Sequence, residues 1–159
     1  DSTDELELVD HGAATAVKDQ GYCGACWVFA AITGLESQYA IATGKLSNFS
    51  VQQAIDCNTQ LSGTGCCGGW SSIIYDDIHQ YTTPEYYGPY LDYYHTSTRP
   101  GCYQNLHTCK SVSTYPALIH GYDQPALSGS QWIDYHYQNG PTNAGFSVEN
   151  AFFSYSGGI

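Results

Sequence analysis

Cys26 is the residue of this sequence whose surroundings point most directly to chemistry. Residues 20–27 read Gln-Gly-Tyr-Cys-Gly-Ala-Cys-Trp, and an apolar run with helical spacing follows. A thiol attacks acyl carbons well only as a thiolate, and a helix N-terminus stabilises a nearby negative charge. We therefore expect Cys26 to be a nucleophile at the start of a helix. Gln20 offers a side-chain amide donor, and Gly24 lets the backbone approach a substrate closely.

Cys23 and Cys26 also form a C-x-x-C pair, which metal and redox sites use as well. No second C-x-x-C follows, although a four-cysteine zinc site would need one. We therefore predict no metal and no organic cofactor. The seven cysteines are an odd number. Six of them can form three disulfides if the protein is exposed to an oxidising compartment. The seventh is then a reactive thiol, an intermolecular bridge or a buried inert thiol, and the count alone does not choose among these.

Residues 23–27 have the C-G-[SA]-C-[WY] form that is typical of papain and cathepsin nucleophiles. The chain resembles the papain-like cysteine proteases, the papain and cathepsin family, over essentially its whole length. Four further segments carry the resemblance: Val17–Gly21 matches the family's lead-in, Ser50–Cys57 is similar to its S-E-Q-E-L-x-D-C helix, Gly65–Gly69 is similar to its G-C-N-G-G loop, and Gly140-Pro141 with Phe153–Ile159 matches its G-P…F…Y-x-G-G-I region.

The resemblance implies a cysteine-type peptidase, an endopeptidase, that hydrolyses peptide bonds through a thioester acyl-enzyme. Cys26 would attack, while its backbone N–H and the amide of Gln20 would form the oxyanion hole. One such donor is typically worth about 2.7–4 kcal/mol of barrier. The same resemblance implies a substrate-binding set made of Gly24, Gly68, Gly69, Trp70, Ser71 and Gly145.

Within that set, Gly68 and Gly69 would present backbone N–H and C=O groups to an extended peptide. Trp70, Ser71 and Gly145 fall on positions that line the second specificity pocket in relatives. An aromatic wall suits an apolar substrate side chain there. The alternative is that Trp70 is simply a core residue.

The resemblance also implies a disulfide pattern. Cys57 has two candidate partners, Cys102 and Cys109, and we favour Cys109 because the sequence after it continues more like the family. This scheme leaves Cys26 free. The three expected bridges are Cys23–Cys66, Cys57–Cys109 and Cys67–Cys102.

The papain mechanism needs a His that takes the thiol proton and an Asn that orients it. Family spacing places them about 130–150 residues after the Cys, and the chain ends at Ile159, near the start of that window. We expect a further segment or a C-terminal light chain to carry them. The alternatives are a non-catalytic homologue with a binding or structural role, and a complete protein of this length. We assign surface or structural roles to the histidines present, His11, His79, His95, His107, His120 and His136.

Several elements must position these residues. The run from Ala25 to Thr43 predicts a buried central helix that Gly44 ends. Ser50-Val51-Gln52-Gln53 has the form of a capping box, which predicts a helix to about Asp56. We expect residues 58–69 to be a stapled loop and 81–115 to be irregular. The remaining expected elements are a helix over 71–80, a helix over 131–138, a strand over 143–148 and a turn at 157–158.

We predict an α+β class and the papain-like two-domain fold. The left domain, mostly helical, would cover residues 12–112 and carry the nucleophile. The right domain, of which this chain would hold part of a β-barrel, would take residues 1–11 and 113–159.

The composition limits the partners. A net charge of −11, from 4 basic and 15 acidic residues, disfavours nucleic acid. No apolar run is long enough to span a membrane. The expected partners are therefore peptide or protein substrates and, by resemblance, a propeptide or cystatin-like inhibitors. Asn48-Phe49-Ser50 is an N-glycosylation pattern, and we expect a secreted or lysosomal protein.

Overall fold

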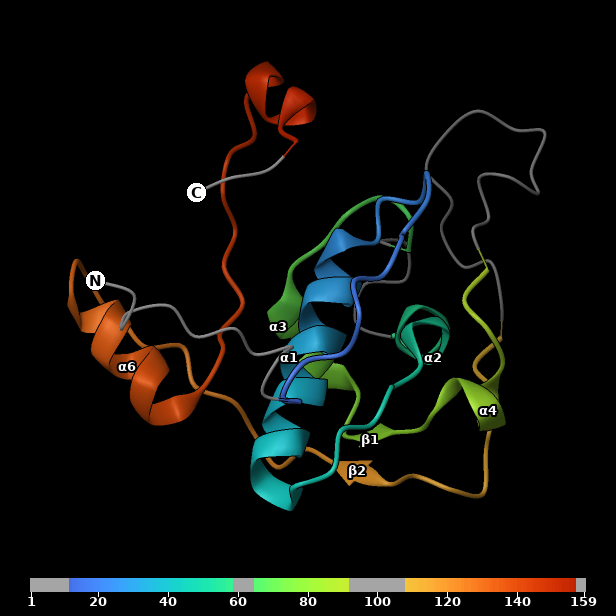
Figure 1. Ribbon diagram of the computed structural model, residues 1–159. Helices are drawn as coiled ribbons and strands as arrows, with labels where there is room; N and C mark the ends of the chain where they lie inside the picture. Colours follow the sequence, from blue (N-terminus) through green and yellow to red (C-terminus); the bar gives the residue numbers. More distant parts are fainter. Residues whose placement is uncertain (1–11, 59–64, 92–107, 157–159) are drawn as a thin grey trace.

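The computed structural model describes residues 12–58, 65–91 and 108–156 (Figure 1). The turn expected at 157–158 and the N-terminal residues 1–11 lie outside this part of the chain. In chain order the elements are α1 (Cys26–Thr43), α2 (Val51–Asp56), α3 (Ser71–Asp77), β1 (Gln80–Tyr81), α4 (Pro84–Tyr87), β2 (Ala117–Leu118), α6 (Gln131–Asn139) and the 3-10 helix η1 (Asn150–Ser154).

Helix α1 is the central element, as the sequence predicts. Val28, Ala31 and Ile32 are completely buried in it. The helix ends at Gly44, whose φ of 69° is left-handed and whose N–H donates to the Ala40 carbonyl at 2.8 Å. Glycine adopts that conformation without steric strain, so the helix ends at the glycine that the sequence predicted.

Helix α2 starts with half of the predicted capping box. The Ser50 hydroxyl accepts a hydrogen bond from the Gln53 N–H at 3.0 Å. The Gln53 side chain does not reach back to Ser50. Its amide instead donates to the Gln80 carbonyl and accepts from the Thr82 N–H, both at 2.9 Å. Gln53 therefore ties α2 to the β1 segment.

Two expectations about residues 71–115 were wrong in part. Helix α3 stops at Asp77 rather than residue 80, because β1 follows and pairs antiparallel with β2, with Tyr81 opposite Ala117. Strand pairing and burial of Tyr81 outweigh the local helical pattern. The segment expected to be irregular also contains α4. Its start at Pro84 and its end before Gly88 are ordinary helix signals, although no helix was expected there.

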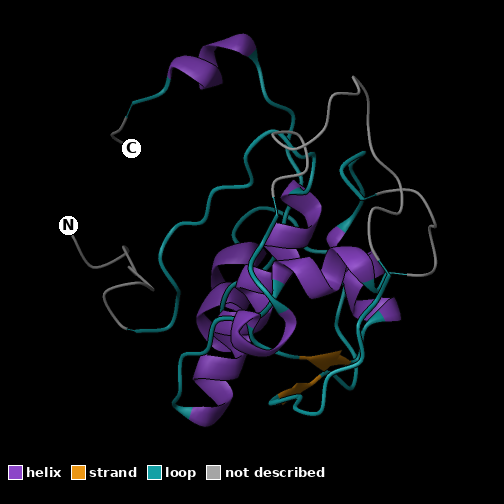
Figure 2. Cartoon of the chain, turned by 90° about the vertical axis from the view of Figure 1, so that its right-hand side faces the viewer, coloured by secondary structure: helices purple, strands orange, loops and turns teal. Residues whose placement is uncertain are grey.

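One hydrophobic core joins these elements. Its buried members include Ile32 of α1, Val51 of α2, Ile74 of α3, Tyr81 of β1 and Ala117 of β2, so these five elements share one interior. Figure 2 shows the short strands at the edge of the main body and one helix, near the C-terminus, well apart from it. This body holds α1, and with it Cys26, in place.

The segment after β2 is built differently. Helix α6 occurs as predicted, one residue longer, but none of its residues is buried. The strand expected over 143–148 is absent, because those residues pair with no described segment and a strand needs such a partner. Residues 144–156 are all exposed. In Figures 1 and 2 this part of the chain runs away from α1 and carries η1 at its far end.

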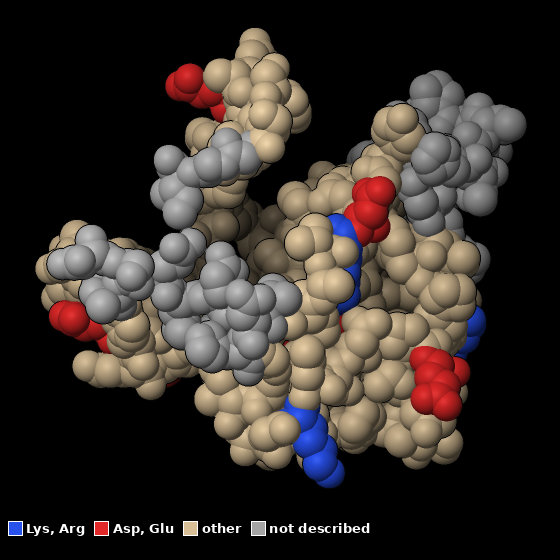
Figure 3. Space-filling model, viewed as in Figure 1, with Lys and Arg blue, Asp and Glu red and all other residues tan. Residues whose placement is uncertain are grey.

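Charged side chains are sparse on the face shown in Figure 3. This agrees with a sequence in which only 12% of residues are charged. None of the described helices combines the length and the apolar character needed to cross a bilayer.

Candidate active site

Cys26 is the first residue of α1, and its thiol is free and exposed. Ala25 directly precedes the helix, and its carbonyl accepts hydrogen bonds from the N–H groups of Val28 and Phe29 at 2.9 and 3.0 Å. No side chain caps this end. The structure therefore places the thiol on the surface, at the positive end of a long helix.

A disulfide fixes the loop before the thiol. Cys23 is bonded to Cys66, as expected from the resemblance. The Gly24 N–H donates to the Cys66 carbonyl at 3.0 Å, and Gly24 forms a parallel bridge with Cys67. A Cβ atom on Gly24 would collide with that carbonyl. Only glycine fits this contact, so the absence of a side chain at position 24 is needed for the two loops to pack together.

Gln20 lies against the same loop. Its side-chain Nε2 donates to the Cys23 carbonyl at 2.9 Å. The Tyr90 hydroxyl donates to the Gln20 carbonyl at 2.7 Å, which holds the backbone. A carboxamide has a second N–H. Stabilisation of an oxyanion by Gln20 stays a prediction.

A buried carboxylate anchors the lead-in to this loop. Glu36 is completely buried, forms an ion pair with Lys18, and accepts hydrogen bonds from the Thr15 hydroxyl at 2.6 Å and the Phe49 N–H at 2.7 Å. The sequence analysis missed it. The sequence offered a clue, because Glu36 is the one charged residue within residues 26–43, and a charge in a buried helix needs a partner.

The expected substrate-binding residues gather near the start of α1. Gly69 lies on the indole of Trp27, where a Cβ would come within 2.7 Å of the ring. Gly68 has a φ of 91°, which also favours glycine. The Ser71 hydroxyl donates to the Trp27 carbonyl at 3.1 Å. These contacts connect the Gly68-Gly69 loop directly to the helix that carries the thiol.

Trp70 is 72% exposed, so the alternative that it is a core residue is wrong. A Cβ on Gly145 would lie 3.6 Å from the Trp70 ring. Two residues expected in one specificity pocket are thus neighbours, although they are far apart in sequence. Their role in binding substrate stays a prediction.

No described histidine is bonded to Cys26. His79 and His120 flank β1 and β2, which lie toward the other end of α1 (Figure 1). His136 of α6 shares a hydrogen bond of 2.6 Å with the Thr142 hydroxyl. All three are exposed. The other histidines, His11, His95 and His107, lie outside the described residues.

The other cysteines that the structure describes are all disulfide-bonded. Cys57 pairs with Cys109, the partner that we favoured. Cys67 is also disulfide-bonded, while its expected partner Cys102 lies outside the described residues. Within the described part of the chain, no group of three or more His, Cys, Asp or Glu side chains could hold a metal ion.

Comparison with known proteins places this chain in a family. A model of the papain family cysteine proteases matches residues 2–159. Fruit bromelain of Ananas comosus is 36% identical over 159 residues, which cover 97% of this chain and 40% of bromelain. This chain thus spans well under half of that relative.

Solved structures that resemble this chain are also cysteine proteases of this kind. Bromelain protease from Ananas comosus, in complex with the E64 inhibitor, has a TM-score of 0.66 and 32% identity over 84% of this chain and 57% of its own. Digestive procathepsin L 3 of Tenebrio molitor larval midgut has a TM-score of 0.61 and 28% identity, covering 79% of this chain and 38% of its own.

Proposed function

Because the chain belongs to the papain family of cysteine proteases, we propose that it carries the nucleophile half of a peptidase that cleaves peptide bonds within proteins. The observation that supports this most directly is the free, exposed thiol of Cys26 at the N-terminus of α1. The Cys23–Cys66 disulfide and the Gly24 contact hold the approach to that thiol. A preorganised nucleophile is what acyl transfer requires.

In the proposed reaction the Cys26 thiolate attacks the carbonyl carbon of the scissile peptide bond. The oxyanion that forms accepts hydrogen bonds from the Cys26 N–H and from the free N–H of the Gln20 side chain. The C–N bond then breaks, the amine leaves with a proton, and a thioester remains on Cys26. Water hydrolyses this thioester and restores the thiol.

A His and an Asn must serve this thiol, and we propose that a polypeptide beyond the described residues supplies them. Support comes from apolar side chains that stand exposed after α6, with Phe146 70% and Phe153 80% exposed. Soluble proteins seldom leave such a surface uncovered. Procathepsin L 3 was solved as a proenzyme, so a propeptide is a further proposed partner, as are cystatin-like inhibitors.

For substrate recognition we propose that Gly68 and Gly69 bind the backbone of an extended peptide. An apolar side chain of that peptide would lie on Trp70, between Ser71 and Gly145. The exposure of Trp70 and its closeness to Gly145 support this.

We also propose a glycan on Asn48 and a secreted or lysosomal location. Asn48 is exposed, whereas Phe49 and Ser50 are only 1% exposed. The Ser50 hydroxyl is engaged as the cap of α2, so the glycan would be added before this helix forms. Mass spectrometry of the peptide that contains Asn48, from protein purified from its natural source, tests the glycan. A peptide without added sugar mass would contradict glycosylation.

The central experiment is reaction of the folded protein with E64, the inhibitor bound in the bromelain structure, followed by mass spectrometry. We expect one adduct, located on Cys26. A Cys26→Ser variant is the matched control and should take none. A natively folded protein whose Cys26 stays unlabelled would contradict the peptidase and favour the non-catalytic, binding alternative.

A further inference from the structure

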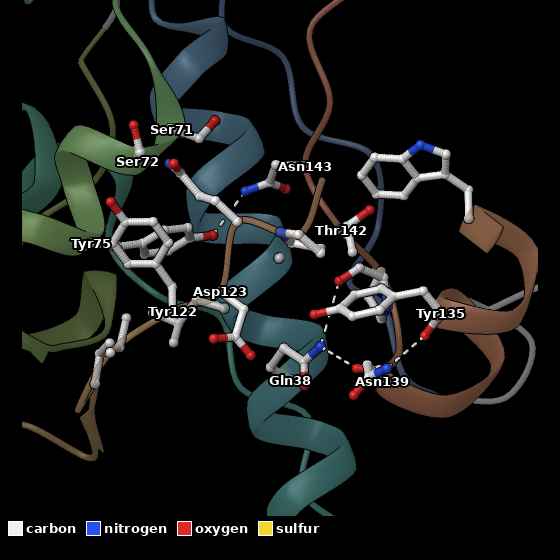
Figure 4. Close-up of a pocket in the computed structure, with 18 residues that line it drawn as sticks. Gln38, Ser71, Ser72, Tyr75, Tyr122, Asp123, Tyr135, Asn139, Thr142 and Asn143 are labelled. Carbon is white, nitrogen blue, oxygen red and sulfur yellow. Dashed lines mark hydrogen bonds between the residues drawn. The ribbon is translucent and has the colours of Figure 1, made fainter. Parts of the chain in front are cut away.

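A cavity of about 650 Å³ lies beside α1 (Figure 4). Ser71 is the one member of the proposed substrate-binding set among its described lining residues, and Cys26 and Gln20 are not among them. Its walls come from α1, α3, the segment 119–125 and residues 132–143. Ligand sites commonly have volumes of about 300–1,000 Å³. The first lining residue of α1 is Gly34, roughly 12 Å along the helix from Cys26 at a rise of 1.5 Å per residue. The cavity is therefore distinct from the thiol.

Aromatic rings border the cavity on two sides. Tyr75 of α3 and Tyr122 lie together, with ring centroids 5.5 Å apart, and Tyr135 of α6 faces them from across the cavity (Figure 4). Trp132 of α6 also lines it. The Tyr75 hydroxyl donates to the Ala31 carbonyl at 2.7 Å. The Tyr122 hydroxyl donates to Asp76 at 3.0 Å. Because the Tyr75 and Tyr122 hydroxyls already donate hydrogen bonds within the protein, these two residues would contact a ligand mainly through their ring faces.

Hydrogen bonds hold the two walls together. The Gln38 amide of α1 donates to the Asn139 carbonyl at 2.7 Å. The Asn143 amide donates to the Tyr75 hydroxyl at 2.8 Å. A Cβ on Gly34 would come within 3.0 Å of the Asn143 side chain, so Asn143 lies close against α1 before the chain turns away (Figure 1). The cavity is preformed by these contacts.

The electrostatics of the cavity favour a positive charge. Asp123 is the one charged side chain among the described lining residues, and Figure 4 shows its carboxylate between the tyrosines and Gln38. The three described lysines, at positions 18, 45 and 110, do not line it. Burial raises the pKa of Tyr75 to about 12, so this hydroxyl stays neutral at physiological pH.

We propose that this cavity binds a small organic cation, an amine or guanidine attached to an apolar body. Ring faces attract cations through their quadrupole, and the effect grows as the cation loses water. The rings would cover the apolar body while the Asp123 carboxylate pairs with the charge. This proposal does not depend on Cys26, so it stands or falls separately from the peptidase.

Isothermal titration of the protein with benzylammonium and with neutral benzyl alcohol tests the proposal, because the two probes differ mainly in charge. We expect benzylammonium to bind saturably, at least about fivefold more tightly than the alcohol. Asp123→Asn should remove most of that preference and leave alcohol binding unchanged. Tyr135→Leu should weaken binding of the cation.

The matched control is Asp134→Asn, an exposed carboxylate of α6 that does not line the cavity. It should leave both affinities unchanged. Circular dichroism checks that each variant folds. If Asp123→Asn fails to fold, the two probes on the unchanged protein and Tyr135→Leu still decide. Equal binding of the two probes, an equal loss in the control, or no saturable binding of benzylammonium would overturn the proposal.

Discussion

Two regions of this chain differ in how far they are built into a core. Every buried residue that the structure describes lies between Cys23 and Ala117, and none of the described residues from 118 to 156 is buried. Both regions contain helices, and α6 is longer than α2 or α3. Helix formation and burial are therefore separate properties, and only the first region has the interior that positions a nucleophile.

This difference makes the two regions respond differently to the same kind of substitution. Changes at buried groups or at their direct partners disturb packed contacts, whereas the matched changes are made at exposed positions, three of the four after Ala117. Four predictions use that contrast, and each is measured by chemical denaturation unless another method is named.

The largest effect is expected for Lys18→Met. The substitution leaves the fully buried Glu36 carboxylate without its cation, and breaking such a pair costs about 3 kcal/mol of unfolding free energy. Lys45→Met is the matched control, because no described ion pair involves Lys45. It should change stability by less than about 0.5 kcal/mol. Equal effects of the two variants would refute an anchoring role for Glu36.

Ile32→Ala should destabilise by about 2–3 kcal/mol, since it removes a completely buried side chain from the core and leaves a cavity. Ile133→Ala in α6 is its counterpart. Ile133 is 59% exposed, so we expect a change within about 0.5 kcal/mol. Similar losses would mean that α6 is buried in solution, and the contrast between the regions would then fail.

Gly24→Ala should destabilise by about 1–2 kcal/mol, because the new methyl group meets the Cys66 carbonyl and the loop must shift. The shift should also slow E64 labelling of Cys26. Gly121→Ala is the control, since no atom lies within 4 Å of its Cβ position. Unchanged labelling in Gly24→Ala would show that the loop does not position the thiol.

The smallest effect is expected at a helix cap. Ser50→Ala removes the hydroxyl that accepts from the Gln53 N–H, at a cost of about 1 kcal/mol. Ser130 precedes α6 but makes no side-chain cap bond. Ser130→Ala should therefore change stability by only a few tenths of a kcal/mol. A larger loss at Ser130 than at Ser50 would contradict these cap assignments.

Local signals in the sequence predicted much of the first region. Gly44 marked the end of α1, and Ser50 marked the start of α2. The same signals failed where distant residues compete. Gln53 was expected to complete a capping box, but it bonds to Gln80 and Thr82 instead. Nothing adjacent in the sequence reveals such a partner.

The candidate site divides in the same way. The position of Cys26 at a helix start followed from the local sequence. The Cys23–Cys66 bridge was implied by the family resemblance, which also favoured Cys109 over Cys102 as the partner of Cys57. The Glu36 anchor and the cavity beside Gly34 followed from neither, because each joins side chains from several segments.

Local sequence patterns were enough to locate the start of α1 and to single out Cys26, because apolar spacing, glycines and caps operate over a few residues. Other features depend on contacts between distant segments. The tertiary structure ended α3 early to pair β1 with β2, left residues 143–148 without a strand partner, and brought Gly145 to Trp70. Hydrogen-bond partners and burial come from residues far along the chain, and their arrangement depends on the whole fold.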